Sequence, residues 1–295
     1  MAAVTALCCT LSLRRGSIQI ALFGLVGGFA TPLLLSSGAD KPVELFGYLL
    51  LLDGAFLYLA RKRDWPVLAA LSLLATLAFQ VGWIGLKMGP GRMWLGSGVL
   101  LIFGALYAAT ARRAESKSAL AWLWNVSTAA AVLLPFGFGL YFASMSRLHV
   151  HPGPLVTMLA LISAGTIWLR YRDPSLVLLQ VAAATANVAV MAAFILAGSA
   201  AEAPIGLAVL VGLAVLHHVA GELTPSGQGA VAWLPAVGAS LGGAMVVFAS
   251  AVALPASASL TWACGLSAAL FAAALLRQAA RNPSLASGLS IAAGL

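Results

Sequence analysis

A single carboxylate, Asp53, stands in the middle of a long apolar stretch and is the residue best suited to chemistry in this sequence. The stretch reads ELFGYLLLLDGAFLYLA and ends at the basic residues Arg61, Lys62 and Arg63. An ionised side chain in hydrocarbon costs about 2.5–3.5 kcal/mol on insertion scales. Asp53 must therefore be protonated, hold a partner or line water. Two interpretations follow: a carboxylate that couples protons or a substrate to transport, and a carboxyl hydrogen-bonded to a neighbouring helix.

The depth of polar residues in the other apolar stretches predicts partners for Asp53. At 1.5 Å per residue, Asp53 lies roughly 12 Å from the basic end of its stretch. Asn125 and Gln180 are each predicted about 9 Å inside their own stretches from the same side. Tyr107 lies somewhat nearer to that side. We therefore predict an intramembrane polar site formed by Asp53, Asn125, Gln180 and Tyr107.

Small residues and one proline predict where helices approach closely or bend. Gly24 and Gly28, like Gly238 and Gly242, are four residues apart, a spacing that permits close helix contact. We interpret both pairs as packing positions. Pro32 removes a backbone hydrogen bond and frees a carbonyl, which predicts a kink. Broken helices also line substrate sites in transporters, so that alternative stays open.

Patterns typical of metal sites or catalysis are weak. His149 and His151 share a loop, but no His-x-x-x-His or Glu-x-x-His spacing supports a metal site. His217 and His218 are neighbours and point to different sides of a helix. The sequence predicts no metal and no cofactor. It also contains no nucleophile elbow, phosphate loop or CxxC motif, which leans against an enzyme.

The composition restricts the class of protein that positions these residues. The chain has 295 residues, of which 62% are hydrophobic and 8% charged, against about 25% charged in ordinary soluble domains. The mean hydropathy is +1.01. A soluble globule needs more polar residues to cover its surface, and a disordered chain needs low hydrophobicity. Three cysteines, two of them adjacent, exclude a disulfide scaffold. A polytopic membrane protein remains.

Ten apolar stretches predict the fold class, an all-α polytopic transmembrane helix bundle with short loops. A helix needs about 20 apolar residues to cross the hydrocarbon layer. The predicted spans are 17–36, 43–60, 65–86, 92–111, 119–143, 154–170, 174–198, 203–220, 230–253 and 258–276.

Three segments follow along the chain. Residues 1–16 are predicted to be a short cytoplasmic or truncated N-terminal segment, and residues 17–276 form the ten-span transmembrane domain. Residues 277–295 are predicted to be a cytoplasmic tail and the start of a truncated further span, because LASGLSIAAGL at 285–295 is apolar again. The chain is therefore expected to be a piece of a longer protein.

The distribution of basic residues predicts the orientation. Twelve Lys and Arg lie on the side that holds the N-terminus and four on the other side. Basic residues near span ends favour the cytoplasm, so both termini are predicted to be cytoplasmic. The weak part is 198–257, whose loops contain no Lys or Arg. The net charge of +8 then forms a rim suited to anionic lipid and not to nucleic acid. Protein partners are not indicated.

The segment 24–68 carries a family resemblance. It contains GGFATPLLLSSG at Gly27–Gly38, LFGYLLLLDG at Leu45–Gly54, and a basic turn before Trp65. These motifs resemble the bacterial family of predicted membrane proteins designated domain of unknown function 2339. The resemblance implies a multi-pass protein of the bacterial inner membrane. Members are typically longer, and the family has no established activity, so the resemblance assigns no residue a role.

Three functions are compatible with these observations. The first is a transporter or permease, which Asp53 favours slightly. The second is a structural or assembly component of the bacterial envelope, which needs no charge inside the membrane. The third is a membrane-embedded enzyme acting on lipid-linked envelope material, which needs titratable groups clustered at one face.

Overall fold

The protein is described by a computed structural model that covers residues 2–34, 40–111, 119–120, 122–145, 152–199, 201–223 and 233–281. All regular secondary structure in these ranges is helical. The α-helices are α1 (Ala2–Arg15), α2 (Ile18–Leu34), α3 (Pro42–Arg63), α4 (Pro66–Lys87), α5 (Met93–Ala111), α6 (Trp122–Ser144), α7 (Pro152–Arg172), α8 (Val177–Ala197), α9 (Ala203–Glu222), α10 (Leu234–Ala253) and α11 (Ala258–Arg281). Two short 3-10 turns, η1 (Pro90–Arg92) and η3 (Pro174–Leu176), precede α5 and α8.

The predicted all-α polytopic fold is confirmed. Each of the ten predicted stretches corresponds to one helix from α2 to α11. Nine of these helices, α3 to α11, are long and apolar enough to cross a membrane, whereas α2 has 17 residues and is shorter. The first residues form a further helix, α1, of 14 residues, which packs against α2 and α3. At 1.5 Å per residue, α1 is about 21 Å long, which is less than the hydrocarbon thickness.

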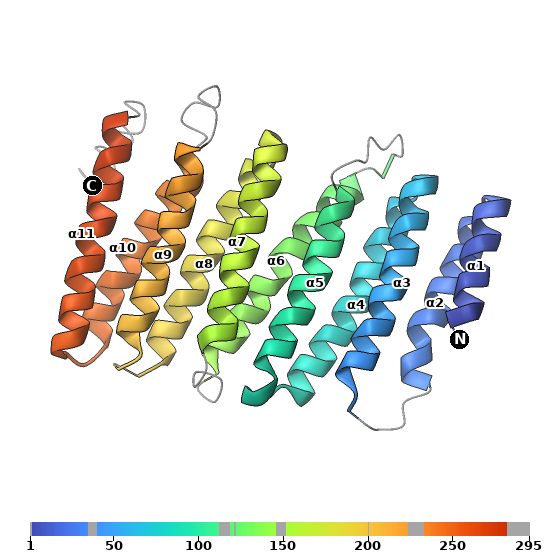
Figure 1. Ribbon diagram of the computed structural model, residues 1–295, viewed down its shortest axis with the longest axis horizontal. Coiled ribbons are helices and arrows are strands. Elements are labelled where there is room, and N and C mark those ends of the chain that lie inside the picture. The colour runs from blue at the N-terminus through green and yellow to red at the C-terminus, as the bar shows by residue number, and fades with distance from the viewer. Residues whose placement is uncertain are drawn as a thin grey trace. The chain divides into compact units, whose positions relative to one another are not determined.

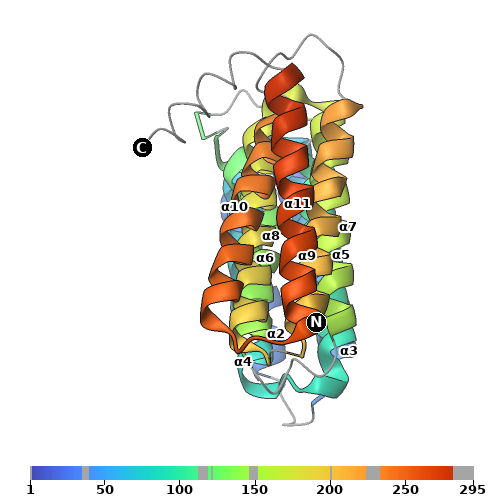
Figure 2. The same cartoon turned by 90° about the vertical axis from the view of Figure 1, so that its left-hand side faces the viewer.

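The chain divides into two compact units, residues 1–134 and 135–295, and α6 contributes to both. In the first unit, α3 packs against α1, α2, α4 and α5. In the second unit, α7, α9 and α11 form one layer and α8 and α10 a second layer behind it (Figures 1 and 2). Within each layer the helices run in the same direction, and consecutive helices alternate between the two layers.

A tight turn fixes the register between α3 and α4. Asp64 adopts the left-handed conformation, with φ 53°, and its N–H donates to the carbonyl of Ala60. Asp is one of the few residues other than Gly that adopt this conformation at low cost. Pro66 then opens α4, where its fixed φ suits the first helical turn. Residues equally far from this turn on the two helices therefore lie at the same depth.

The carbonyl freed by Pro32 is hydrogen-bonded across helices. Pro32 has no N–H, so the carbonyl of Gly28, four residues earlier in α2, loses its helical donor. The hydroxyl of Tyr48 in α3 donates to this carbonyl at 3.0 Å. Gly24 and Gly28 are both buried in α2. The carbonyl that Pro32 frees therefore accepts a hydrogen bond that links α2 to α3.

Replacing Tyr48 by Phe is expected to lower the free energy of unfolding by about 1 kcal/mol, because it removes only this hydroxyl. In a Pro32→Ala background the helix supplies its own donor, so the same substitution is expected to cost less. Thermal unfolding in detergent measures both effects. Tyr58→Phe, on the exposed side of α3, is the control. Equal losses from the two Tyr substitutions would contradict the role given to Tyr48.

A polar contact ties the start of α3 to the end of α4. Asp40, just before α3, forms an ion pair with Arg92 of η1 and accepts a hydrogen bond at 3.1 Å from the indole N–H of Trp83. The hydrogen bonds from Arg92 and Trp83 hold the pKa of Asp40 below its usual range. Folding therefore gains stability from this carboxylate above the pKa of the unfolded chain, about 4.

The stability that Asp40 adds to the folded chain is expected to disappear as the pH falls through the pKa of Asp40 in the folded state. Protonation weakens its contacts with both Arg92 and Trp83. Wild type and Asp40→Asn should differ in melting temperature at neutral pH and converge in acid. The matched control is Glu44→Gln, which breaks the exposed pair of Glu44 with Lys41. A difference between wild type and Asp40→Asn that stays constant with pH would refute this account.

Candidate functional site

Asp53 lies at the centre of a buried hydroxyl cluster in the first unit. Thr76 Oγ1 donates to its Oδ2 at 2.6 Å, and Tyr107 Oη donates to its Oδ1 at 3.1 Å. Ser72 Oγ also donates to Oδ1, and Tyr107 Oη reaches Ser72 Oγ at 3.0 Å. All four side chains are buried. We call Asp53, Ser72, Thr76 and Tyr107 the hydroxyl cluster.

The α3–α4 turn places the hydroxyls at the depth of the carboxylate. Asp53 lies ten residues before Arg63, the end of α3, and Thr76 lies ten residues after Pro66, the start of α4. Ser72 lies four residues before Thr76, so both hydroxyls occupy one face of α4. At 1.5 Å per residue, Asp53 lies about 15 Å from the end of α3, halfway along the helix. The cluster therefore occupies the middle of a membrane-crossing helix.

The partners of Asp53 suit both of its protonation states. Each hydroxyl carries one hydrogen and lone pairs, and it can rotate. An ionised carboxylate accepts from all of them, as seen here, whereas a protonated carboxyl donates to one while the hydroxyls turn. Among the described residues, every hydrogen-bond partner of Asp53 is a hydroxyl group. An arginine or lysine in their place would fix the ionised state.

The predicted polar site is divided by the structure. Tyr107 lies beside Asp53, but Asn125 does not, because its side chain is exposed. Because α6 starts at Trp122, Asn125 lies only about 4.5 Å from the helix end. It also lies off the buried face of α6, which carries Trp124 and Thr128. Gln180 is buried in the second unit, where its side chain contacts Arg170 and His217.

Gln180 belongs to a second polar network, which joins α7, α8 and α9. Arg170 Nη1 donates to Gln180 Oε1 at 2.7 Å, and Gln180 Nε2 lies 3.3 Å from His217 Nδ1. On the other side of the imidazole, Asn187 Nδ2 lies 3.4 Å from His217 Nε2 and 2.7 Å from Ser163 Oγ. All five side chains are buried. The network starts near the end of α7 and reaches Ser163, halfway along the same helix.

Arg170 sets the polarity of this network. The guanidinium only donates, so Gln180 must turn its oxygen towards Arg170 and its N–H₂ towards His217. Nδ1 of His217 then accepts, and the neutral imidazole carries its hydrogen on Nε2. The Asn187 atom nearest to that hydrogen is Nδ2, which is itself a donor. If the Asn187 amide is turned over, its oxygen accepts this hydrogen and also faces Ser163 Oγ. The buried Arg170 thus orients the Gln180 amide, and through it favours the His217 tautomer that accepts at Nδ1.

Sequence reasoning missed Ser72, Thr76 and Arg170. The i, i+4 spacing of Ser72 and Thr76 was a usable signal, because it puts two hydroxyls on one helix face. Arg170 gave no signal, since it is the last residue of the predicted span 154–170, where basic residues normally face water, yet it is only 3% exposed.

The remaining candidates are packing positions or carry no ligand cluster. A Cβ on Gly242 would lie 2.9 Å from Val188 Cγ1, whereas one on Gly238 would lie 3.5 Å from Thr185 Cγ2. Close packing against α8 is therefore tightest at Gly242. Within the described ranges no group of three His, Cys, Asp or Glu side chains converges as a metal site would. His149 and His151 lie outside the described residues.

Comparison with known proteins places the chain in a family. The family model described as "Predicted membrane protein (DUF2339)" matches residues 1–295. The chain belongs to this family. The match covers the whole sequence, whereas the motifs that carried the resemblance lie in the first three predicted spans. No curated protein and no solved structure matches the chain. The protein is thus a multi-pass membrane protein of unassigned activity.

Proposed function

We propose that the chain is a transporter-like protein of the bacterial inner membrane in which Asp53 binds and releases a proton. The observation that carries the proposal is the hydroxyl cluster, in which a carboxylate halfway along α3 has only rotatable hydroxyl partners. Ionisable residues inside a membrane are costly and are by default candidates for proton relays or substrate paths. In this proposal the basic helix ends face the cytoplasm, which the positive-inside rule supports.

A second candidate is a structural or assembly component of the envelope. It is favoured by the saturation of Asp53, since both carboxylate oxygens already accept hydrogen bonds. Exposed apolar side chains along α11, among them Trp262, Leu266 and Leu276, also offer a surface for lipid or another helix. In this case the hydroxyl cluster only fastens α3, α4 and α5 together.

Carbodiimide labelling of Asp53 separates the two candidates. The full chain in native membranes is treated with dicyclohexylcarbodiimide across a pH series, with and without a water-soluble amine, and the Asp53 peptide is quantified by mass spectrometry. A proton-binding carboxyl reached by water is expected to label less as the pH rises, and the amine is expected to intercept the adduct. Absent labelling, or labelling insensitive to pH and amine, would support the structural candidate.

Two variants control this measurement. Asp53→Asn removes the reactive carboxyl and sets the background. Tyr107→Phe keeps the ring but removes one hydroxyl that bonds Oδ1, so the pH of half-maximal labelling is expected to move. Glu44, an exposed carboxylate on the same helix, is an internal standard for reagent access. A Tyr107→Phe profile identical to that of wild type would mean that the cluster does not govern titration.

A further inference from the structure

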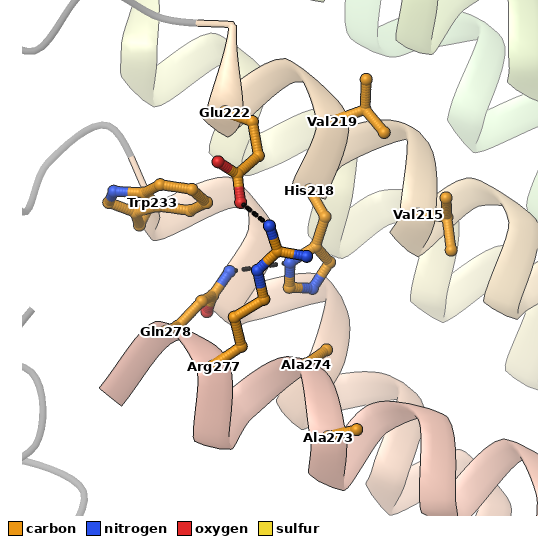
Figure 3. A pocket seen from close by; sticks show the side chains of 9 residues that line it. All are labelled: Val215, His218, Val219, Glu222, Trp233, Ala273, Ala274, Arg277 and Gln278. Carbon is orange, nitrogen blue, oxygen red and sulfur yellow. Dashed lines mark hydrogen bonds and ion pairs between the residues drawn. The ribbon is translucent and has the colours of Figure 1, made fainter. Parts of the chain in front are cut away.

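A groove between α9 and α11 in the second unit combines an apolar wall with an ion pair at its end. Figure 3 shows the nine side chains that line it, and its volume is about 310 Å³. Val215 and Val219 of α9 and Ala273 and Ala274 of α11 form the apolar part. Both valines are about half exposed to the outside of the helix layer. The apolar wall therefore opens towards the lipid.

Two opposite charges face each other at the end of this wall. Arg277 Nη2 of α11 lies 2.9 Å from Glu222 Oε1 of α9, and Figure 3 shows the guanidinium reaching across the groove. Glu222 is the last residue of α9, and Arg277 lies four residues before the end of α11. The side chain of Glu222 is 34% exposed and that of Arg277 is 63% exposed. Both charges thus lie near the helix ends, where lipid headgroups lie, and both remain accessible.

The wall of the groove is preformed. Gln278 Nε2 contacts His218 Nδ1 at 2.9 Å, and His218 Nε2 contacts Ser240 Oγ at 2.6 Å, which joins α9, α10 and α11. The ring of Trp233 packs on Gly221, where a Cβ would lie 2.9 Å from Cε3. Tryptophan prefers the headgroup level of a membrane. These contacts hold the two charges in place without depending on a ligand.

We propose that this groove binds a phospholipid whose headgroup carries both a phosphate and a primary ammonium, such as phosphatidylethanolamine. The phosphate contacts Arg277 and the ammonium contacts Glu222, so the four charges alternate in sign. An anionic headgroup without the ammonium, such as phosphatidylglycerol, would place its phosphate near Glu222 with no positive charge between them, which is less favourable. Val219 and Val215 lie about 4.5 and 10.5 Å below Glu222 along α9, which suits the first part of an acyl chain.

Lipid retention measured by native mass spectrometry tests the proposal. The full chain is reconstituted with equal amounts of phosphatidylethanolamine and phosphatidylglycerol of the same acyl chains, and retained lipids are counted. Wild type is expected to retain phosphatidylethanolamine over phosphatidylglycerol by about two- to fivefold, the range of an exposed ion pair. Equal retention of the two lipids would overturn the proposal.

Matched variants separate recognition from loss of the ion pair. Glu222→Gln and Arg277→Gln both break the ion pair, so a purely structural effect would change lipid retention in the same way in both variants. Glu222→Gln is expected to abolish the preference while phosphate binding remains, and Arg277→Gln is expected to lower retention of both lipids. Glu44→Gln breaks an exposed ion pair elsewhere and should behave as wild type. A preference that survives in Glu222→Gln would refute the ammonium contact.

Soluble O-phosphoethanolamine distinguishes a lipid from a free headgroup. It offers the same phosphate and ammonium but no acyl chain. At the concentration of the lipid it is expected not to displace phosphatidylethanolamine, because the apolar wall contributes to binding. Complete displacement would show that the site takes a soluble ligand and would overturn the lipid proposal.

Discussion

Replacement of Asp53 by alanine is expected to lower the free energy of unfolding by about 2–3 kcal/mol, because each buried polar group that loses its partner costs about 1–3 kcal/mol. Ser72 and Thr76 can turn to carbonyls of their own helix, which limits the loss. Tyr107 has no such choice and keeps only its contact with Ser72. Denaturation of the purified chain in mixed detergent micelles measures the change.

Two further variants test whether the loss comes from the hydroxyl cluster. Asp53→Asn keeps the shape and one oxygen acceptor, so it is expected to cost about 1 kcal/mol. Glu44→Ala removes a carboxylate from the exposed side of the same helix, and exposed ion pairs contribute at most about 1 kcal/mol. If Asp53→Ala and Glu44→Ala destabilise the chain equally, Asp53 does not hold α3, α4 and α5 together.

The helices were predictable because hydrocarbon imposes their length. Apolar runs separated by short polar turns leave few alternatives, and the ten predicted stretches match α2 to α11 to within a few residues. The short helix α1 was not predicted as a helix, since the apolar run at the N-terminus is too short to span a membrane. Its place follows from tertiary contact, in which the Arg63 side chain donates to the carbonyl of Leu13.

The site was predictable only in part because depth does not identify neighbours. Tyr107 has a depth similar to that of Asp53 and does lie beside it, since α5 packs on α3. Asn125 lies nearer the helix end than predicted, because α6 starts three residues later, and its side chain is exposed because it lies off the buried face of α6. Arg170 was unpredictable, because a basic residue near a helix end faces water or the protein depending on the packing of α8 and α9.

Gly243→Ala is expected to be the most damaging single-methyl change described here, lowering the free energy of unfolding by about 1–3 kcal/mol through overpacking. Gly243 in α10 faces the ring of Phe271 in α11, and an added Cβ would lie 2.8 Å from both Cε atoms. Phe271 is 2% exposed, so its rigid ring cannot move aside without shifting α11. Thermal unfolding in detergent checks this expectation.

Gly212→Ala in α9 is the matched control, because nothing lies within 4 Å of its added Cβ. There the better helix propensity of Ala, worth about 0.8–1.0 kcal/mol in soluble helices, is the main effect, so no loss is expected. A second substitution, Phe271→Leu, removes the ring and should restore part of the stability lost in Gly243→Ala. If Gly243→Ala behaves like Gly212→Ala, the ring of Phe271 does not pack closely on the backbone of α10.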